Sequence, residues 1–459
     1  MKRFSEQILD KWMDNPQRKP LIIRGARQVG KSTLVRQFAQ AKGLALYELN
    51  LEKHIALEPV FRSLNIQAIL RELEGLFGKA INKDDSLLFL DEIQAVPSAL
   101  PALRYFYEEY PRLPVIAAGS LLEFLLKEHS FSMPVGRIEY LHLGPMTFEE
   151  YLYEADRDYL RYLIEYSPGS DLPDTVHHHL LERQREFLLV GGMPEALQTY
   201  IGTHQFLEAM NVQRTIIATY QDDFAKYAAR HSLLRLQKVF NYAPRAIGRK
   251  VKYSNISREE TAREIKTALE LLVKARLVTP VFHSHCSGLP LRSEIDDHTF
   301  KLVFLDVGLM NRICGLDWLA ISALNDRDLV NEGPMAEQFI GQHLQYFYEN
   351  EPPGLCYWLR EARSENAEVD FVISRGDVVV PVEVKAGKSG TLRSLLQFVQ
   401  EKHSRVALRF DLNKPSVQTV RHQLRQADGV KSVACTLISL PLYLVGQTAR
   451  ILDQFRRNG

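Results

Sequence analysis

One run of eight residues sets the strongest limit on how the first third of this chain can fold. It fits the pattern G-x-x-x-x-G-K-[ST] at every position and reads Gly25-Ala26-Arg27-Gln28-Val29-Gly30-Lys31-Ser32. The apolar segment Leu21-Ile22-Ile23 precedes the run, and a helical pattern over Thr33–Ala41 follows it. The sequence therefore predicts a strand, a glycine-rich loop and a helix, with the loop at the helix N-terminus.

A loop of this kind turns its backbone N–H groups inward, where they bind phosphate oxygens. Gly25 and Gly30 permit the backbone angles and the close approach that this needs. We expect Lys31 to reach the β and γ phosphates and the Ser32 hydroxyl to ligate Mg²⁺. The predicted cofactors are therefore ATP and Mg²⁺. The predicted cofactor-binding residues are Gly25, Ala26, Arg27, Gln28, Val29, Gly30, Lys31, Ser32 and Thr33.

A second apolar run, Leu87–Leu90, ends in two carboxylates, Asp91 and Glu92. In phosphate-loop enzymes an aspartate at such a strand end holds the Mg²⁺ site. Asp91 is therefore the predicted metal carboxylate, together with Ser32. The adjacent Glu92 is the predicted general base that polarises the attacking water, with Lys31 as the second catalytic residue. This arrangement favours hydrolysis over transfer to a small molecule.

Two further residues are candidates for sensing the γ-phosphate. Ser120 follows the apolar segment Val115–Ala118, where ATPases place a small polar group; a plain turn after a strand is the alternative. Arg137 precedes the strand candidate Ile138–Leu143 and is a candidate arginine finger, which stabilises transition-state charge and can act across a subunit interface. The alternative for Arg137 is a solvated arginine at a strand start.

Length and composition limit the remaining classes. The chain has 459 residues, which exceeds the roughly 250–300 that one hydrophobic core supports. Its net charge of +1 provides no global field for nucleic acid, so any such binding has to come from local patches. The four cysteines form no CxxC pair, which favours a reducing compartment. No secretion signal or bilayer-length apolar run is apparent, so we expect a cytoplasmic chain without a membrane partner.

The order of the patterns predicts an α/β fold class in four parts. Residues 1–150 alternate short apolar runs with helical patterns, which indicates a parallel sheet. Residues 151–230 have a helical period and are expected to form a lid or connector. Residues 231–325 contain helices followed by two strand candidates, which is typical of a winged-helix-like unit. Residues 326–459 are expected to form a second α/β domain.

Strings along nearly the whole chain carry a family resemblance. They are LIIRGARQVGKSTLVRQFA, LLFLDEIQ, VIAAGS, GRIEYLHLGPMTFEEYL, GGMPEAL, GPMAEQFI, YWLREARSENAEVDFVI and PVEVKAG. Together they resemble a group of prokaryotic AAA-type ATPases related to the archaeal ATPase family. The resemblance implies a P-loop AAA-like core, a helical lid, a winged-helix-like segment, and a C-terminal domain of unknown function with a restriction-endonuclease-like core.

The C-terminal part contains a predicted β-hairpin, Glu368–Ile373 followed by Val378–Val384. Glu383 and Lys385 are two residues apart, so their side chains share one face, and strand pairing can bring Asp370 to that face. Two carboxylates and a lysine form the D…E-x-K signature of restriction-endonuclease-like nucleases. In such a site the carboxylates hold Mg²⁺ or Mn²⁺, which activates water.

Glu337 lies on the helical segment Pro334–Phe347 and resembles the extra acidic residue that such folds place on their first helix. The predicted residues of this second, nuclease-like site are Glu337, Asp370, Glu383 and Lys385. A structural core that binds no metal, or a module that binds nucleic acid without cutting it, has the same pattern. Cleavage therefore stays open.

Three functions are compatible with these patterns. The first is Mg²⁺-dependent ATP hydrolysis coupled to a nucleic-acid-related C-terminal module. The second is a low-turnover, nucleotide-dependent switch or scaffold that binds a protein partner. The third is an ATP-gated, metal-dependent nuclease. The expected partners are ATP, DNA or RNA, a protein, and further copies of the chain, since AAA-type sites usually lie between subunits.

Overall fold

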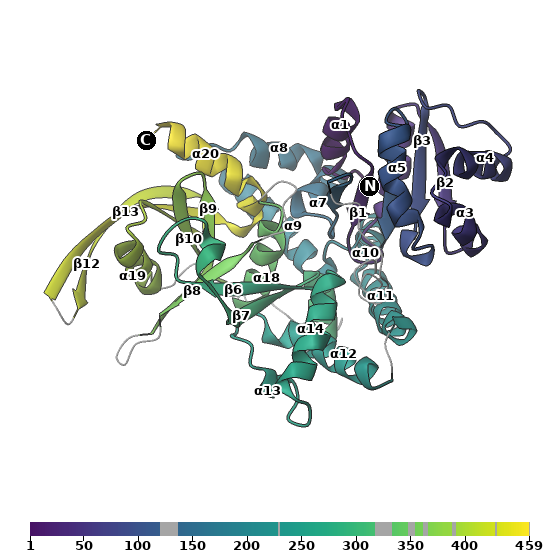
Figure 1. Ribbon diagram of the computed structural model, residues 1–459. Coiled ribbons are helices and arrows are strands. Elements are labelled where there is room, and N and C mark those ends of the chain that lie inside the picture. Colours follow the sequence, from purple (N-terminus) through teal and green to yellow (C-terminus); the bar gives the residue numbers. More distant parts are fainter. Residues whose placement is uncertain are drawn as a thin grey trace. The chain divides into compact units, whose positions relative to one another are not determined.

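The structure is a computed structural model. It describes residues 1–119, 136–227, 230–316, 333–347, 354–360, 366–387, 392–426 and 429–458. The described chain divides into two compact units. The first unit comprises Met1–Gly144 with Glu270–Leu277, and the second comprises Pro145–Leu269 with Val278–Gly459. Figure 1 colours the chain from purple at the N-terminus to yellow at the C-terminus and labels many of its elements.

The first unit is built on a parallel sheet whose five described strands have the order β2-β3-β4-β1-β5. The strands are β1 (Leu21–Arg24), β2 (Ala45–Asn50), β3 (Ser86–Asp91), β4 (Val115–Gly119) and β5 (Glu139–His142). Strands β1, β3, β4 and β5 each lie within one residue of the predicted bounds. Because every neighbouring pair is parallel, all five carboxyl ends lie at one edge of the sheet.

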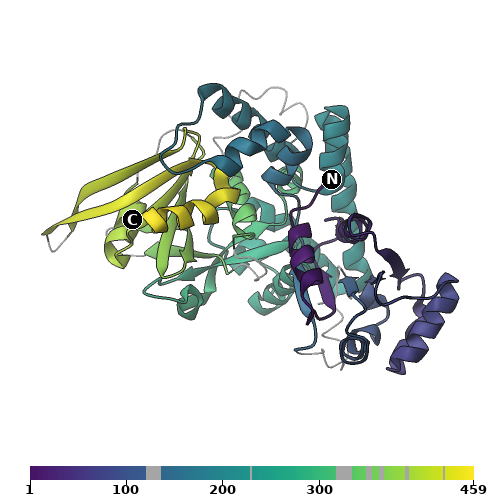
Figure 2. The same cartoon turned by 90° about the horizontal axis from the view of Figure 1, so that it is seen from above.

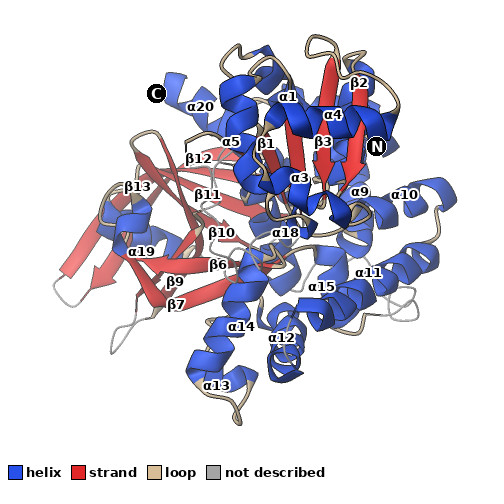
Figure 3. Ribbon diagram, turned by 45° about the vertical axis from the view of Figure 1, so that its right-hand side comes forward, coloured by secondary structure: helices blue, strands red, loops and turns tan. Residues whose placement is uncertain are grey.

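Helices flank the strands of the first unit (Figure 3). They are α1 (Glu6–Asp14), α2 (Lys31–Ala41), α3 (Glu58–Arg62), α4 (Ile66–Phe77) and α5 (Ala99–Glu109), with the 3-10 turns η1 (Ile55–Leu57) and η2 (Ile93–Ala95). Ile22 and Leu88 of the sheet pack in one core cluster with Phe61 of α3 and Phe106 of α5. Cover by helices explains why β3 and β4 are buried at every position and read as continuous apolar runs.

The second unit contains a mixed sheet whose eight described strands have the order β12-β13-β11-β10-β9-β8-β6-β7. The strands are β6 (Val278–Ser284), β7 (Ile295–Phe304), β8 (Cys356–Arg360), β9 (Ala367–Arg375), β10 (Val378–Val384), β11 (Val406–Asp411), β12 (Ser416–Gln426) and β13 (Gly429–Pro441). The predicted hairpin is confirmed, because β9 and β10 pair antiparallel. At the end of the sheet, β12 and β13 extend as a long two-stranded ribbon (Figure 2).

The strands β6 and β7 do not form a separate winged-helix-like unit over residues 231–325. They pair with each other as expected, but β6 also pairs in parallel with β8, at Phe282 and Cys356. Both strands therefore belong to the C-terminal sheet. The helix-strand-strand pattern identified the local hairpin correctly. Its third partner lies more than seventy residues further along the chain, where sequence periodicity gives no signal.

Helices make up most of the rest of the second unit. They are α7 (Phe148–Ala155), α8 (Arg157–Glu165), α9 (Asp174–Val190), α10 (Pro194–Thr203), α11 (Phe206–Tyr227), α12 (Arg230–Tyr242), α13 (Tyr253–Ile256), α14 (Ala262–Lys274, which continues into the first unit), α15 (Val307–Ile313), α18 (Gly333–Leu344), α19 (Arg393–Lys402) and α20 (Thr448–Asn458). The short 3-10 turns are η3 (Ala243–Ala246), η4 (Leu291–Glu294) and η5 (Leu442–Gln447). Among the described helices, none has both the length and the apolar character to cross a bilayer.

The glycines of the string GGMPEAL lie at a buried place in the second unit, where neighbouring segments pack closely against them. The Gly192 N–H donates to Asp306 Oδ2 at 2.6 Å, and the Leu309 N–H donates to Oδ1 of the same carboxylate at 3.0 Å. A Cβ atom on Gly191 would lie 2.1 Å from Asp306 Oδ1, and one on Gly192 would lie 2.1 Å from the Met146 carbonyl oxygen. Both glycines are therefore required by packing around one buried aspartate.

His343 of α18 is a buried histidine held neutral by its partners. Its Nε2 accepts the Phe148 N–H at 2.9 Å, so its Nδ1 carries the proton and donates to the Phe339 carbonyl at 2.8 Å. Burial lowers the pKa of His343 from 6.5 to about 4, although the bond to Phe339 opposes this shift. The pKa is depressed on folding, so the unfolded chain takes up a proton at a higher pH than the folded chain.

We predict that this histidine makes the second unit acid-sensitive. The contribution of neutral His343 to the free energy of unfolding is fully present above pH 6.5. This contribution is lost as the pH falls toward 4, by up to about 3 kcal/mol. Thermal unfolding of the wild type and of His343→Asn, followed from pH 7.5 to 4.5, tests this. The stability difference between the two proteins should shrink on acidification. A difference that is constant with pH would contradict the assignment.

Candidate nucleotide site

The predicted phosphate loop joins β1 to α2 at the carboxyl edge of the first unit's sheet. Gly30 has φ 92° and Gln28 has φ 61°, so the loop enters the left-handed region twice. A Cβ atom on Gly25 would lie 2.0 Å from the Leu143 carbonyl oxygen, so a larger residue does not fit there. Backbone angle and close approach thus explain the two glycines of the motif.

The remaining loop residues differ in exposure. Ala26 and Val29 are buried, Arg27 is half-buried, and Gln28 and Thr33 are exposed. The buried positions fix the loop to the domain, and the polar ones lie at its surface. Their predicted contacts with nucleotide stay predictions.

Arg3 holds the loop to the rest of the unit. Its buried guanidinium donates to the Val29 carbonyl at 2.7 Å and to the Gly144 carbonyl at 2.9 Å. These bonds join the loop to the segment that follows β5. Sequence reasoning missed Arg3, because a charged residue in an amphipathic N-terminal segment normally faces solvent.

Lys31 lies inside the loop that it is expected to serve. Its Nζ donates to the carbonyls of Gly25 at 3.0 Å and Ala26 at 2.8 Å, and the side chain is buried. Burial lowers the pKa of the Lys31 ammonium to about 8, with the carboxylates of Glu92 and Asp91 acting in the opposite direction. The group is therefore cationic at neutral pH and held by neutral carbonyls, which phosphate oxygens can replace.

Ser32 and Asp91 meet at the same edge. The Ser32 hydroxyl donates to Asp91 Oδ2 at 2.9 Å, and the other oxygen of Asp91 accepts the Glu92 N–H at 3.1 Å. Burial raises the pKa of Asp91, and the bond from Ser32 opposes the rise. A hydroxyl and a carboxylate side by side are hard oxygen ligands, so these two residues fit a Mg²⁺ ion.

Glu92 has an unusual backbone conformation and an intramolecular partner. Its φ of 50° and ψ of 47° lie in the left-handed region, which costs free energy for a residue other than glycine. The side-chain amide of the buried Gln94 donates to the Glu92 carboxylate. A Cβ atom on Gly119 would lie 2.5 Å from Gln94 Oε1, so Gln94 also packs against the end of β4. In the sequence, the signal for Gln94 is a polar residue next to apolar ones in the string LDEIQ.

A second polar contact lies beside the loop, on the β5 side. His142 is paired with Arg24 in the sheet, and its Nδ1 lies 3.3 Å from Arg276 Nη2. Burial, and then the charges of Arg276 and Arg24, lower the pKa of His142 to about 4, so the ring is neutral and can accept from a guanidinium. Arg276 comes from the Glu270–Leu277 segment, which no motif had indicated.

The two predicted sensors have different outcomes. Ser120 lies outside the described residues. Arg137 pairs with Glu108 of α5 at 3.0 Å and is 46% exposed. It precedes β5, whose Glu139 aligns with Leu21 at the start of β1, so it lies at the amino edge of the sheet. The phosphate loop lies at the opposite edge, so Arg137 is not brought to the nucleotide site of its own chain. A role across a subunit interface stays a prediction.

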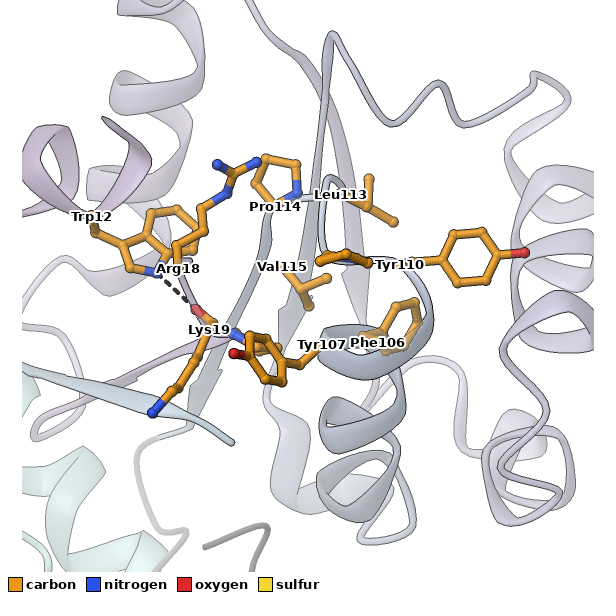
Figure 4. Close-up of a pocket in the computed structure, with 11 residues that line it drawn as sticks. Trp12, Arg18, Lys19, Phe106, Tyr107, Tyr110, Leu113, Pro114 and Val115 are labelled. Carbon is orange, nitrogen blue, oxygen red and sulfur yellow. Dashed lines mark hydrogen bonds between the residues drawn. The ribbon is translucent and has the colours of Figure 1, made fainter. Parts of the chain in front are cut away.

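A small pocket also lies at the amino edge, between α1, α5 and β4 (Figure 4). The Trp12 indole donates to the Lys19 carbonyl at 2.8 Å, and Arg18 Nη2 donates to the Arg112 carbonyl at 2.8 Å. The space measures about 10 Å³, close to the minimum for one water molecule. It is too small for a nucleotide, so the loop edge remains the candidate site.

The predicted nuclease-like residues gather in the second unit. Asp370 of β9 accepts the N–H of Val384 at 2.8 Å through Oδ2, and Glu383 of β10 is in contact with Lys385. Burial, and then the charge of Asp370, raise the pKa of Glu337 to about 8 and that of Glu383 to about 7. The four residues therefore belong to one buried cluster. Two further members, Lys301 and Glu368, were missed by sequence reasoning.

Comparisons with known families match three separate segments of the chain. Residues 17–152 match an AAA domain, residues 181–320 match a domain of unknown function (DUF8612), and residues 332–437 match another (DUF4143). The AAA match contains the phosphate loop, Asp91 and Glu92. Residues 17–152 are therefore similar to an AAA domain, and the predicted phosphate loop lies within the matched segment.

The similar proteins provide little information about the chemistry of the site. An uncharacterized protein of Methanocaldococcus jannaschii is 26% identical over 210 residues, which is 43% of this chain and 43% of that protein's length. The Aeropyrum pernix ORC2 protein has a TM-score of 0.31 at 13% identity, over 69% of this chain and 93% of that chain. The Thermotoga maritima RuvB Holliday junction branch migration motor has a TM-score of 0.28 at 17% identity, over 60% and 87%. Because these identities and TM-scores are low, the assignment of the site depends on the phosphate loop and its neighbouring carboxylates.

We predict that Arg3→Ala destabilises the first unit and weakens ATP binding. The buried Val29 carbonyl and the part-buried Gly144 carbonyl lose their charged donor, which costs about 1–3 kcal/mol. Thermal unfolding and titration with a fluorescent ATP analogue measure the two effects. The control is Lys2→Ala, which removes a neighbouring cation that is 44% exposed. Equal stability and affinity in the two variants would show that Arg3 does not support the loop.

Proposed function

We propose that this chain binds ATP with Mg²⁺ and hydrolyses it. The observation that carries the proposal is the hydrogen bond between Ser32 and Asp91, which brings the predicted metal ligands together beside the ammonium of Lys31. Ser32 lies after strand β1 and Asp91 lies at the end of strand β3, and both are at the same edge of the sheet. Both motifs are thereby united at one place.

Each residue has a separate role in this proposal. The loop N–H groups and Lys31 bind the phosphate chain, with Lys31 exchanging the carbonyls of Gly25 and Ala26 for phosphate oxygens. Ser32 and Asp91 would hold Mg²⁺, which neutralises phosphate charge when bound. Glu92 takes the proton of the water whose oxygen forms a bond to the γ-phosphorus, while the bond to the ADP oxygen breaks.

The contact between Gln94 and Glu92 favours a second candidate. While the amide holds the carboxylate, Glu92 is less available as a base, which fits a nucleotide-dependent switch with little turnover. In that case ATP would be bound tightly and a protein partner would read the bound state. The ratio of binding to hydrolysis separates the two candidates.

The first test compares wild type, Glu92→Gln and Lys31→Ala. We expect Glu92→Gln to bind ATP normally and to lose about 10²–10⁴-fold in kcat, since it removes a general base. Lys31→Ala should lose binding. Phosphate release and equilibrium binding of ATP are measured at fixed Mg²⁺. Undiminished hydrolysis in Glu92→Gln would refute the enzyme proposal, and tight binding with negligible wild-type turnover would favour the switch.

A finer part of the proposal concerns the second unit, as a restriction-endonuclease-like core that contacts nucleic acid. The motif hairpin β9–β10 supports it. A series of contacts within the first unit also leads from the loop to the segment that precedes β6. Leu143 touches Gly25, its neighbour His142 contacts Arg276, and β6 of the C-terminal sheet begins two residues after Arg276. In this proposal, movement of the loop on hydrolysis acts on the segment that leads into β6.

We predict that DNA raises ATP turnover. Turnover is measured with single-stranded and double-stranded DNA at two fixed salt concentrations, because phosphate contacts weaken with salt. Arg276→Lys should keep basal turnover within a few-fold and reduce the stimulation, since its ammonium does not reproduce the guanidinium geometry. Turnover that does not respond to either DNA would contradict the nucleic-acid assignment while leaving the ATPase proposal intact.

A further inference from the structure

A lysine lies inside the acidic cluster of the second unit. Lys301 of β7 is 3% exposed, and its ammonium lies 3.5 Å from Glu337 Oε2 and 3.8 Å from Asp370 Oδ1. It also forms an ion pair with Glu368. Glu337 comes from α18, and Glu368 and Asp370 come from β9. With Lys301 on β7, the ion pairs therefore join side chains from three elements.

The position of Lys301 depends on a long reach across the sheet. In the strand order, β8 and β6 lie between β9 and β7. The Lys301 ammonium lies 5.3 Å from the ring centroid of Tyr357 on β8, so the side chain extends over this ring toward β9. A cation over an aromatic face, with carboxylates beyond it, is held at a defined place.

The other members of the cluster are also engaged. Asp370 Oδ2 accepts the backbone N–H of Val384, and Glu383 is paired with Lys385. One oxygen, Glu383 Oε2, is buried without a hydrogen-bond partner among the described residues, but one oxygen does not hold a divalent cation. Within the described ranges, no group of three or more acidic, histidine or cysteine side chains is arranged to hold a metal ion.

The residues as arranged therefore do not fit the divalent metal that the D…E-x-K pattern leads one to expect. Buried carboxylates need a positive partner, and the lysine already supplies one. We propose that Lys301 is a built-in counter-cation that takes the place of the divalent metal in this cluster. The C-terminal unit then keeps the nuclease-like arrangement without metal-assisted cleavage of phosphodiesters.

The test uses Mn²⁺ as the probe, followed by the electron paramagnetic resonance signal of the free ion. All proteins are nucleotide-free full chains carrying Asp91→Asn, which removes the metal carboxylate of the nucleotide site. With Lys301 intact, we expect no Mn²⁺ binding that Asp370→Asn or Glu383→Gln diminishes. Lys301→Gln should gain one Mn²⁺ site, which should bind Mn²⁺ at least tenfold more tightly than the chain with Lys301 intact does. Adding Asp370→Asn should abolish this site. Lys301→Arg keeps the charge and should gain none.

Two results would overturn the proposal. One is Mn²⁺ binding by the chain with Lys301 intact that is lost in Asp370→Asn, since the lysine would then yield to the metal. The other is a folded Lys301→Gln protein that gains no site. If Lys301→Gln does not fold, the intact chain decides alone. Its thermal midpoint should not shift with Mn²⁺, and it should cleave labelled DNA in Mn²⁺ no faster than Asp370→Asn does; a shift or faster cleavage refutes the proposal.

Discussion

The hydrogen bond between Ser32 and Asp91 spans 59 residues of sequence and depends on parallel strand pairing. Because β1, β4 and β3 run in the same direction, the loop after β1 and the carboxylates after β3 reach the same sheet edge. The tight contact of Gly25 with Leu143 after β5, and the bonds of Arg3 to Val29 and Gly144, then fix the height of the loop at that edge. Sheet direction, more than any single side chain, creates the site.

The described part of the chain contains two buried lysines whose surroundings have opposite effects on the lysine pKa. Lys31 is bonded to neutral carbonyls, and burial lowers its pKa to about 8, so its positive charge is available to an incoming phosphate. Lys301 is also buried, but the carboxylates of Glu337, Asp370 and Glu368 raise its pKa above the usual range. A buried lysine held by acidic side chains is costly to remove, because Asp370 and its acidic neighbours would lose their positive partner. One lysine is therefore suited to binding a ligand and the other to excluding one.

The sequence predicted the elements that local pattern controls. Strands β3 and β4 of the first unit are continuous apolar runs because helices cover them, and the β9–β10 hairpin shows alternation around a turn. The phosphate loop was also evident, since its residues are contiguous. Arg3 and Lys301 were not predicted, because each acts through partners that the fold brings close. Gln94 was also missed, although its partner Glu92 is only two residues away in the sequence. The parallel pairing of β6 with β8 was missed for the same reason.

The assignment of β6 to the C-terminal sheet changes how nucleotide and cluster can be related. In a chain of four independent parts, the loop and the acidic cluster would communicate only through surfaces. Here Arg276, in contact with His142 beside the loop, is followed two residues later by β6. β6 pairs antiparallel with β7, the strand that carries Lys301. The segment beside the loop is therefore continuous in sequence with the strand pair that carries the counter-cation.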